Sequence, residues 1–313
     1  MYRSFDPAAL GISGRQSEII ALTLTFGYRG LVLDFPELLK RAEERGIVQA
    51  SRFLSSARLK IGGFELPDTW REDEATFKAN LGSLAANAKT ASAAGVSICR
   101  GTVLPGTDYY PYHENFEIHR QRLGEMAEVL APHNIRLALD FLAAPAHRAG
   151  REFQFIADAE AMVLLIKSIG SPHVGLALDT WNWHFGGGTT DLIKALGANQ
   201  VFMCSIADGM PETTQDALTE EQRVMPCEKG IVDIGPMLEV LRDAKFDGPV
   251  TLAPPSELPY GNEPRRDPEG VPLGFRSSLG GGRFNQEQKI GDRQRLTRAT
   301  GLTSNMVGGC PEN

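Results

Sequence analysis

Three aspartates that each come at or just after the end of a short apolar run are the first candidates for chemistry. They are Asp140, Asp179 and Asp208. If the apolar runs are parallel strands of one barrel, the three carboxylates meet at the edge where those strands end. Converging carboxylates repel one another unless a cation compensates, and hard oxygen ligands suit Mg²⁺ or Mn²⁺. We therefore expect a divalent metal held by these side chains; the alternative is that each aspartate caps a turn or pairs with an arginine.

The segment at residues 180–185 reads Thr-Trp-Asn-Trp-His-Phe and is rich in aromatic and hydrogen-bonding side chains. Aromatic faces stack on the C–H faces of sugars, and Asn and His side chains bond hydroxyl groups. We expect Trp181, Asn182 and His184 to contact a substrate, and one of the two tryptophans in the segment to pack beneath the loop. Arg223, in the long loop after the seventh apolar run, is a further expected substrate contact, or else a solvated surface arginine.

A run of three glycines at residues 186–188 leads into Thr189, Thr190 and Asp191. Free N–H groups at such a helix start could hold a phosphate or a carboxylate. The same string also reads as a loop in which a threonine caps the helix that follows. Because the run contains no Lys or Arg, we favour the cap.

The elements that must position these residues alternate between short apolar runs and longer amphipathic stretches, which predicts βα units around a parallel sheet. The expected strands are Ala8–Ile12, Gly30–Leu33, Leu59–Leu66, Val96–Thr102, Ile135–Phe141, Val174–Leu178, Gln200–Ile206 and Val250–Ala253. The expected helices include Arg15–Phe26, Arg71–Gly95, Glu114–Leu130, Asp158–Ile169 and Pro236–Ala244. The pattern predicts a (β/α)8 barrel over residues 1–261 whose eighth helix is missing. Residues 262–313 lack apolar periodicity and are expected to form a disordered tail.

The composition limits the classes of partner. The chain has 313 residues, a hydrophobic fraction of 42% and a net charge of −7. An acidic chain argues against a nucleic-acid surface, which needs a clustered basic face. The four cysteines form no CxxC pair, the N-terminus has no apolar signal segment, and no apolar run is long enough to span a membrane. These features favour a cytoplasmic protein that binds neither nucleic acid nor a membrane, and they leave homo-oligomerisation open.

Five motifs in the order of a known family add a resemblance. They are Ile135–Asp140, Gly175–Trp183, Val201–Asp208, Arg223–Ile234 and Asp247–Ala253. Over residues 8–258 the chain resembles the sugar phosphate isomerase/epimerase family, which has the xylose isomerase-like TIM barrel. The resemblance implies a sugar, sugar phosphate or polyol isomerase or epimerase that moves a proton next to a carbonyl with the help of a divalent metal.

The residues at the family's metal positions depart from its pattern. The family holds the metal with Glu, Asp, His and Glu from strands five to eight, and those places here are Asp140, Asp179, Ser205 and Ala253. The resemblance makes Asp140 the expected base, but Ala253 offers neither a lone pair nor a titratable proton. The alternative is therefore a non-catalytic or altered-chemistry sugar-binding relative with a degraded metal site. AP endonucleases that share this barrel are disfavoured, because neither their multi-metal cluster nor a basic DNA-facing surface is visible.

Overall fold

The computed structural model describes residues 1–253 apart from 212, 214–217 and 228. Its main sheet has nine strand segments, and every pairing within it is parallel. In spatial order they are β3 (Lys60–Ile61), β2 (Gly30–Leu31), β1 (Tyr2–Phe5), β13 (Pro249–Leu252), β10 (Val201–Ile206), β9 (Val174–Asp179), β7 (Arg136–Phe141), β5 (Ile98–Val103) and β4 (Phe64–Glu65). The expected tail at residues 262–313 and the question of the eighth helix lie outside the described residues.

The sheet closes on itself because its two outermost segments belong to one stretch of chain. β3 pairs with β2 and β4 pairs with β5, while Gly62 and Gly63 join β3 to β4. A β-carbon on Gly63 would lie 2.9 Å from the carbonyl oxygen of Ile98, so the close approach at this joint requires glycine. The result is eight strand positions in a ring, which confirms the predicted (β/α)8 barrel.

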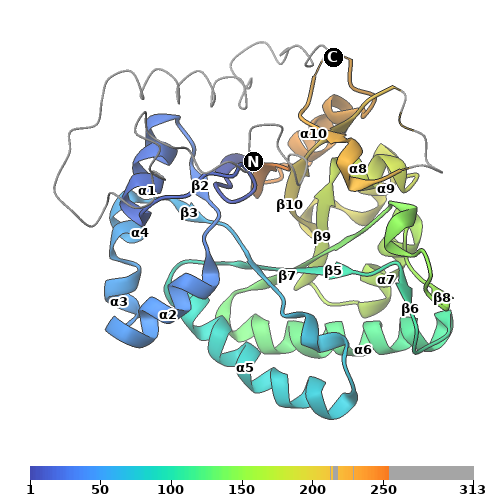
Figure 1. Ribbon diagram of the computed structural model, residues 1–313, viewed down its shortest axis with the longest axis horizontal. Helices are drawn as coiled ribbons and strands as arrows, with labels where there is room; N and C mark the ends of the chain where they lie inside the picture. Colours follow the sequence, from blue (N-terminus) through green and yellow to red (C-terminus); the bar gives the residue numbers. More distant parts are fainter. Residues whose placement is uncertain (212, 214–217, 228, 254–313) are drawn as a thin grey trace, which may run out of the picture.

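Most of the helices lie around the outside of the strands (Figure 1), whereas α8 follows β9 directly at the carboxyl end of the barrel. They are α1 (Gln16–Thr25), α2 (Phe35–Arg45), α3 (Ile47–Ala50), α4 (Arg52–Ala57), α5 (Glu74–Ala93), α6 (Tyr112–Leu130), α7 (Ala159–Ile169), α8 (Thr180–Phe185), α9 (Thr190–Leu196) and α10 (Ile234–Asp243). Figure 1 shows α5 and α6 side by side, and α6 also packs against α7. Among the described residues, no helix combines the length and apolar character that crossing a membrane requires.

Two small antiparallel strand pairs lie at the rim of the barrel where the strands of the main sheet end. One joins β6 (Gly106–Thr107) to β8 (Phe153–Gln154), and the other joins β11 (Asp208–Gly209) to β12 (Arg223–Val224). Both are formed by the loops that follow barrel strands, which is where active sites of this fold are built.

The predicted first strand at Ala8–Ile12 is wrong. The first strand is Tyr2–Phe5, which pairs with both β2 and β13, whereas residues 7–11 form turns. Gly11 has φ of +62°, and the Asp6 carboxylate accepts a hydrogen bond from the Ala9 amide at 3.1 Å. The apolar side chains of the 8–12 segment pack on the core from a turn, so the apolar run alone was a misleading signal.

Candidate active site

Polar side chains from neighbouring strands gather inside the carboxyl-end rim of the barrel, which we call the mouth. Asp140 is the last but one residue of β7, Asp179 ends β9, and Ser205 and Thr251 come from β10 and β13. Ser205 lies opposite Asp179 on one side and opposite Thr251 on the other. These four side chains are each at least nine-tenths buried, so their hydrogen bonds within the protein decide what they can do.

Asp140 is held by an arginine that the sequence analysis did not single out. Its Oδ2 accepts hydrogen bonds from Nε of Arg100, at 3.1 Å, and from Nη2 of the same guanidinium. Nη1 of Arg100 lies 3.6 Å from the Glu65 carboxylate, so one cation joins acids from β4 and β7. The Asp140 charge raises the pKa of Arg100 despite burial, which keeps the guanidinium charged.

Asp179 is held by a second arginine. Nη1 of Arg223 donates to Oδ2 of Asp179 at 2.8 Å, and Nε of Arg223 donates to Glu220 at 3.1 Å. The guanidinium carbon lies 4.6 Å from the centre of the Trp181 ring, within the range of a cation–π contact. Burial alone would lower the pKa of Arg223, but the charges of Asp179 and Glu220 outweigh burial and raise it. Arg223 is therefore a buried partner of Asp179, and the solvated alternative is wrong.

Asp208 has a different role from the other two aspartates. Its Oδ1 accepts hydrogen bonds from the amides of Gly209, at 2.8 Å, and Val232, at 3.0 Å. The carboxylate lies directly against Gly230, where a β-carbon would stand 1.8 Å from Oδ2. Asp208 thus ties the β11–β12 loop to the segment that leads into α10.

Most of the predicted substrate contacts on α8 are buried. Asp179 caps this helix by accepting from the Asn182 amide at 2.9 Å, and the Asn182 side chain accepts from the Ala143 amide at 3.0 Å. Trp181 and Trp183 are 0% and 1% exposed, so the expectation that only one tryptophan packs beneath the loop is wrong. His184 is half-buried, with its ring edge-on to that of Phe185.

The glycine run leads into a capped helix, as favoured from the sequence. Oγ1 of Thr189 accepts from the Leu192 amide at 3.2 Å at the start of α9. A β-carbon on Gly188 would lie about 2.4 Å from the Trp183 ring, so that glycine is required by packing. The glycine run therefore packs against α8 through Gly188 and the Trp183 ring.

Two buried polar atoms near the mouth have no hydrogen-bond partner among the described residues. They are Oδ1 of Asp140 and Nε1 of Trp181, an acceptor and a donor. A buried polar atom without a partner costs free energy, which a bound water or a ligand group can recover. A hydroxyl group complements such a pair of atoms, because it both donates and accepts.

The family follows from comparison with known proteins. A family model described as a xylose isomerase-like TIM barrel matches residues 20–272. The chain belongs to the xylose isomerase-like TIM barrel family. The resemblance seen in the sequence is thereby confirmed.

The relatives of this xylose isomerase-like barrel include inosose isomerases. The enzymes from Halalkalibacterium halodurans and Bacillus subtilis are each 25% identical to it over 134 residues, which is 42% of this chain and 43% and 44% of theirs. The match therefore spans less than half the length of these relatives. The likeness supports membership of the family, and the relatives' activity is not thereby established for this chain.

Solved structures of the family share the barrel. A xylose isomerase domain protein from Alicyclobacillus acidocaldarius matches with a TM-score of 0.74 and 21% identity, over 97% of this chain and 100% of that one. The IolI protein, solved with a bound zinc atom, matches with a TM-score of 0.67 and 18% identity, over 82% of this chain and 90% of that one. At these identities the likeness shows the fold, and the zinc atom belongs to the IolI protein.

The residues at the family's metal positions in this barrel do not fit a divalent cation. Oδ2 of Asp140 and Oδ2 of Asp179 each bond to a guanidinium, and this fixed positive charge beside each carboxylate repels a second cation. The hydroxyl of Ser205 lies 3.3 Å from that of Thr251, and Ala253 carries no donor atom. Among the described residues, no three His, Cys, Asp or Glu side chains form a group that could hold a metal. The expectation that Asp140, Asp179 and Asp208 converge on one ion is wrong for this arrangement.

The most important side chain that sequence reasoning missed in this family member is Arg100. Its signal was present, because an arginine in the middle of the apolar segment 98–103 needs a partner when that segment is a buried barrel strand. Asp6, which follows β1, was also missed; burial raises its pKa, and the nearby Arg100 opposes that shift.

Proposed function

We propose that this chain binds a sugar or polyol at the mouth of the barrel as an altered-chemistry member of its family, without a divalent metal. The observation that carries the proposal is the replacement of the metal's charge by two arginines. Arg100 and Arg223 each neutralise one of the two carboxylates that stand at metal positions.

The unpartnered atoms of the mouth support a hydroxyl-rich ligand. Oδ1 of Asp140 can accept from a ligand hydroxyl, and Nε1 of Trp181 is a buried donor that also lacks a partner among the described residues. About a third of the Arg100 side chain is exposed, so its guanidinium can meet a ligand oxygen while it stays bonded to Asp140. In this proposal His184, which is half-buried, contacts the ligand from α8, while Asn182 and Arg223 hold the loops in place.

The names of the relatives set the ligand class to be tested. The matching enzymes are inosose isomerases, and a D-psicose 3-epimerase solved with D-tagatose shares the fold at 14% identity with a TM-score of 0.64. Cyclic polyols and ketoses therefore head the panel of test compounds. The second candidate function is the family's own isomerase or epimerase chemistry, with a metal and with Asp140 as the base.

The metal experiment separates the two candidates. The thermal midpoint of the wild type and of Asp179→Asn is measured with EDTA and with Mn²⁺, Mg²⁺ or Zn²⁺. We expect each protein to melt at the same temperature under all conditions, because a ligand that binds only the native state is needed to raise the midpoint. A metal-dependent rise in the wild type that Asp179→Asn abolishes would restore the metal-dependent candidate.

The ligand experiment tests the binding site itself. Calorimetry with the panel of cyclic polyols and ketoses is run on the wild type, on His184→Ala and on the matched control His133→Ala. His133 lies in the 3-10 turn that precedes β7, at the opposite end of that strand from Asp140. We expect binding that weakens about tenfold in His184→Ala, which is ~1.4 kcal/mol, and that is unchanged in the control. Absence of binding across the panel would contradict the proposal.

A further inference from the structure

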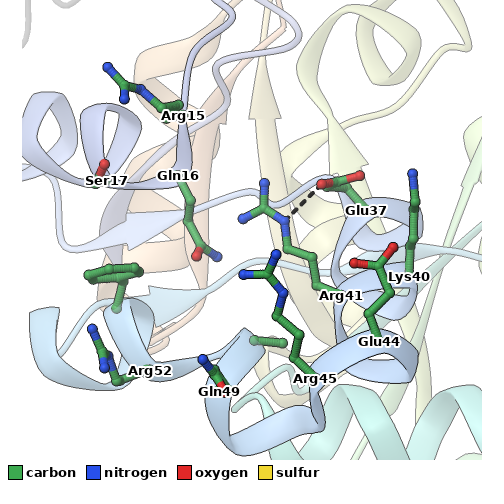
Figure 2. A pocket seen from close by; sticks show the side chains of 12 residues that line it. Arg15, Gln16, Ser17, Glu37, Lys40, Arg41, Glu44, Arg45, Gln49 and Arg52 are labelled. Atoms are coloured by element: carbon green, nitrogen blue, oxygen red, sulfur yellow. Dashed lines mark hydrogen bonds and ion pairs between the residues drawn. The ribbon is translucent and has the colours of Figure 1, made fainter. Parts of the chain in front are cut away.

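A groove of about 560 Å³ lies on the outer wall of the barrel between α1, α2 and the short helices α3 and α4. Figure 2 shows the guanidinium groups of Arg41 and Arg45 reaching from α2 across the groove, with Arg15 above and Arg52 below. None of the groove's lining residues belongs to the mouth.

The lining carries an excess of positive charge on an acidic chain. Its five cationic side chains are Arg15, Lys40, Arg41, Arg45 and Arg52, against the two carboxylates Glu37 and Glu44. The whole chain has a net charge of −7. A positive groove on a negative protein concentrates anions there, while the rest of the surface repels them.

The carboxylates of the groove leave much of this charge available. Arg41 donates through Nε to Glu37 at 2.8 Å, so this bond does not use its two terminal nitrogens. Arg15 is paired with Glu18 at 2.9 Å. Within the described part of the chain, Arg45 and Arg52 form no ion pair; the guanidinium of Arg52 lies 5.1 Å from the Phe53 ring.

Two cations on α2 repel each other when no anion is bound in the groove. Arg41 and Arg45 are one turn apart, and like charges at that spacing destabilise a helix by a few tenths of a kcal/mol. Only one of them has a carboxylate partner among the described residues. An anion between the two guanidiniums would turn this repulsion into two attractive contacts.

We propose that this groove binds a small oligophosphate, meaning a compound with two or more linked phosphate groups. The planar fork of a guanidinium matches phosphate oxygens in pairs, and Arg41, Arg45 and Arg52 present guanidinium nitrogens to the groove that no carboxylate of the described residues engages. The side chains of Gln16, Ser17 and Gln49 add neutral donors along the same lining. The volume is typical of small-molecule sites and is larger than one phosphate needs, so several linked phosphates fit it best.

The test uses the full chain at constant ionic strength. Pyrophosphate and tripolyphosphate are titrated by calorimetry into the wild type, into Arg45→Gln/Arg52→Gln, and into the matched control Lys89→Gln/Arg120→Gln. The control removes two exposed charges from α5 and α6, outside the groove. We expect binding to weaken at least about tenfold in the groove variant and to persist in the control.

Further variants and ligands test which feature of the ligand the groove recognises. Arg45→Lys/Arg52→Lys keeps the charge and loses the forks, so it should bind tripolyphosphate more weakly than the wild type and more tightly than the glutamine variant. Equal binding of ATP and tripolyphosphate shows that the phosphates carry recognition, and tighter ATP binding adds a nucleoside contact at the same site. The proposal is overturned if sulfate binds as well as pyrophosphate, if all variants bind alike, or if polyglutamate binds and oligophosphates do not.

The oligophosphate proposal stands independently of the function proposed for the mouth. The glutamine variant leaves Asp140, Arg100 and His184 untouched, so its binding of cyclic polyols or ketoses should equal that of the wild type. Loss of both kinds of binding in that variant would indicate a folding defect, which the thermal midpoint measures directly.

Discussion

The chemistry of the mouth depends on how two carboxylates are neutralised. A buried ion pair repays its desolvation only when the geometry is good and the remaining polar atoms are bonded. Arg223 meets this condition, because it bonds to Asp179 and Glu220 and stacks on Trp181. Arg100 meets it in part, because Oδ1 of Asp140 stays unpartnered among the described residues. In the proposed binding site, a ligand hydroxyl that donates to Oδ1 of Asp140 would complete the hydrogen bonds of this ion pair.

The contact between Asp208 and Gly230 can be tested by substituting the glycine. In Gly230→Ala the new β-carbon would stand 1.8 Å from Oδ2 of Asp208, so either the carboxylate or the loop must move. We expect the free energy of unfolding to fall by about 1–3 kcal/mol, as for overpacked sites. Urea unfolding measures the change. Gly235→Ala is the control, because a β-carbon there meets nothing within 4 Å; an equal loss in both variants would contradict the proposed role of Asp208.

Sequence reasoning found the acids of the site and named pairing with an arginine as the alternative to a metal, but it did not assign Arg100 and Arg223 as the partners. Asp140 and Asp179 stand out because a carboxylate at the end of an apolar run is visible in a few consecutive residues. Their partners are 40 and 44 residues away, and they become visible only when the strand register and the long loop are known. Asp208 was misjudged for a related reason, since one of its amide donors lies 24 residues further along the chain.

At the scale of elements, the alternation of apolar and amphipathic stretches was enough to predict seven of the eight strand positions and the barrel. The exception is β1 (Tyr2–Phe5), which carries two polar side chains. The turn that follows it is more apolar, and the strand was therefore predicted there. The division of the third strand at Gly62 was also beyond the sequence. It follows from the close approach of this strand to β2 and β5, where a β-carbon on Gly62 would lie 3.0 Å from Val32.

The start of α9 gives a prediction for a single element. Thr189→Ala removes the hydroxyl that accepts from the Leu192 amide, so one N–H of the first turn loses its partner. We expect the free energy of unfolding to fall by about 1 kcal/mol in chemical denaturation. Thr190→Ala, one residue further on and inside the helix, should change it by less than about 0.5 kcal/mol. A larger loss in Thr190→Ala would show that the cap is misassigned.

At the scale of the whole molecule, charge is distributed unevenly. The carboxylates of the mouth are balanced by buried arginines, whereas the outer groove has more cations than carboxylates.

Outside both sites, the buried His119 contributes to the response of the fold to pH. The aromatic side chains of Trp70 and Phe155 pack around this imidazole, with ring centres 5.0 and 4.7 Å away.

His119 predicts a loss of stability in mild acid. Burial lowers the pKa of His119 from 6.5 to about 4, although its hydrogen bond to the Asn115 carbonyl opposes the shift. Between these two values the unfolded chain binds a proton that the folded chain does not, so the free energy of unfolding falls as the pH falls. The difference of pKa corresponds to a loss of about 3 kcal/mol by pH 4.

His119→Phe keeps an aromatic ring against Trp70 and Phe155 and removes the titration. Asp6, whose pKa is raised by burial, acts in the opposite direction, because its folded carboxyl binds a proton more readily than the unfolded one. That contribution is common to both proteins and cancels when the two are compared. We therefore expect the urea-unfolding free energy of the wild type to fall more steeply than that of His119→Phe from pH 7 to pH 4. Parallel curves would show that the imidazole has the same pKa in the folded and the unfolded chain, which the buried aromatic surroundings of His119 argue against.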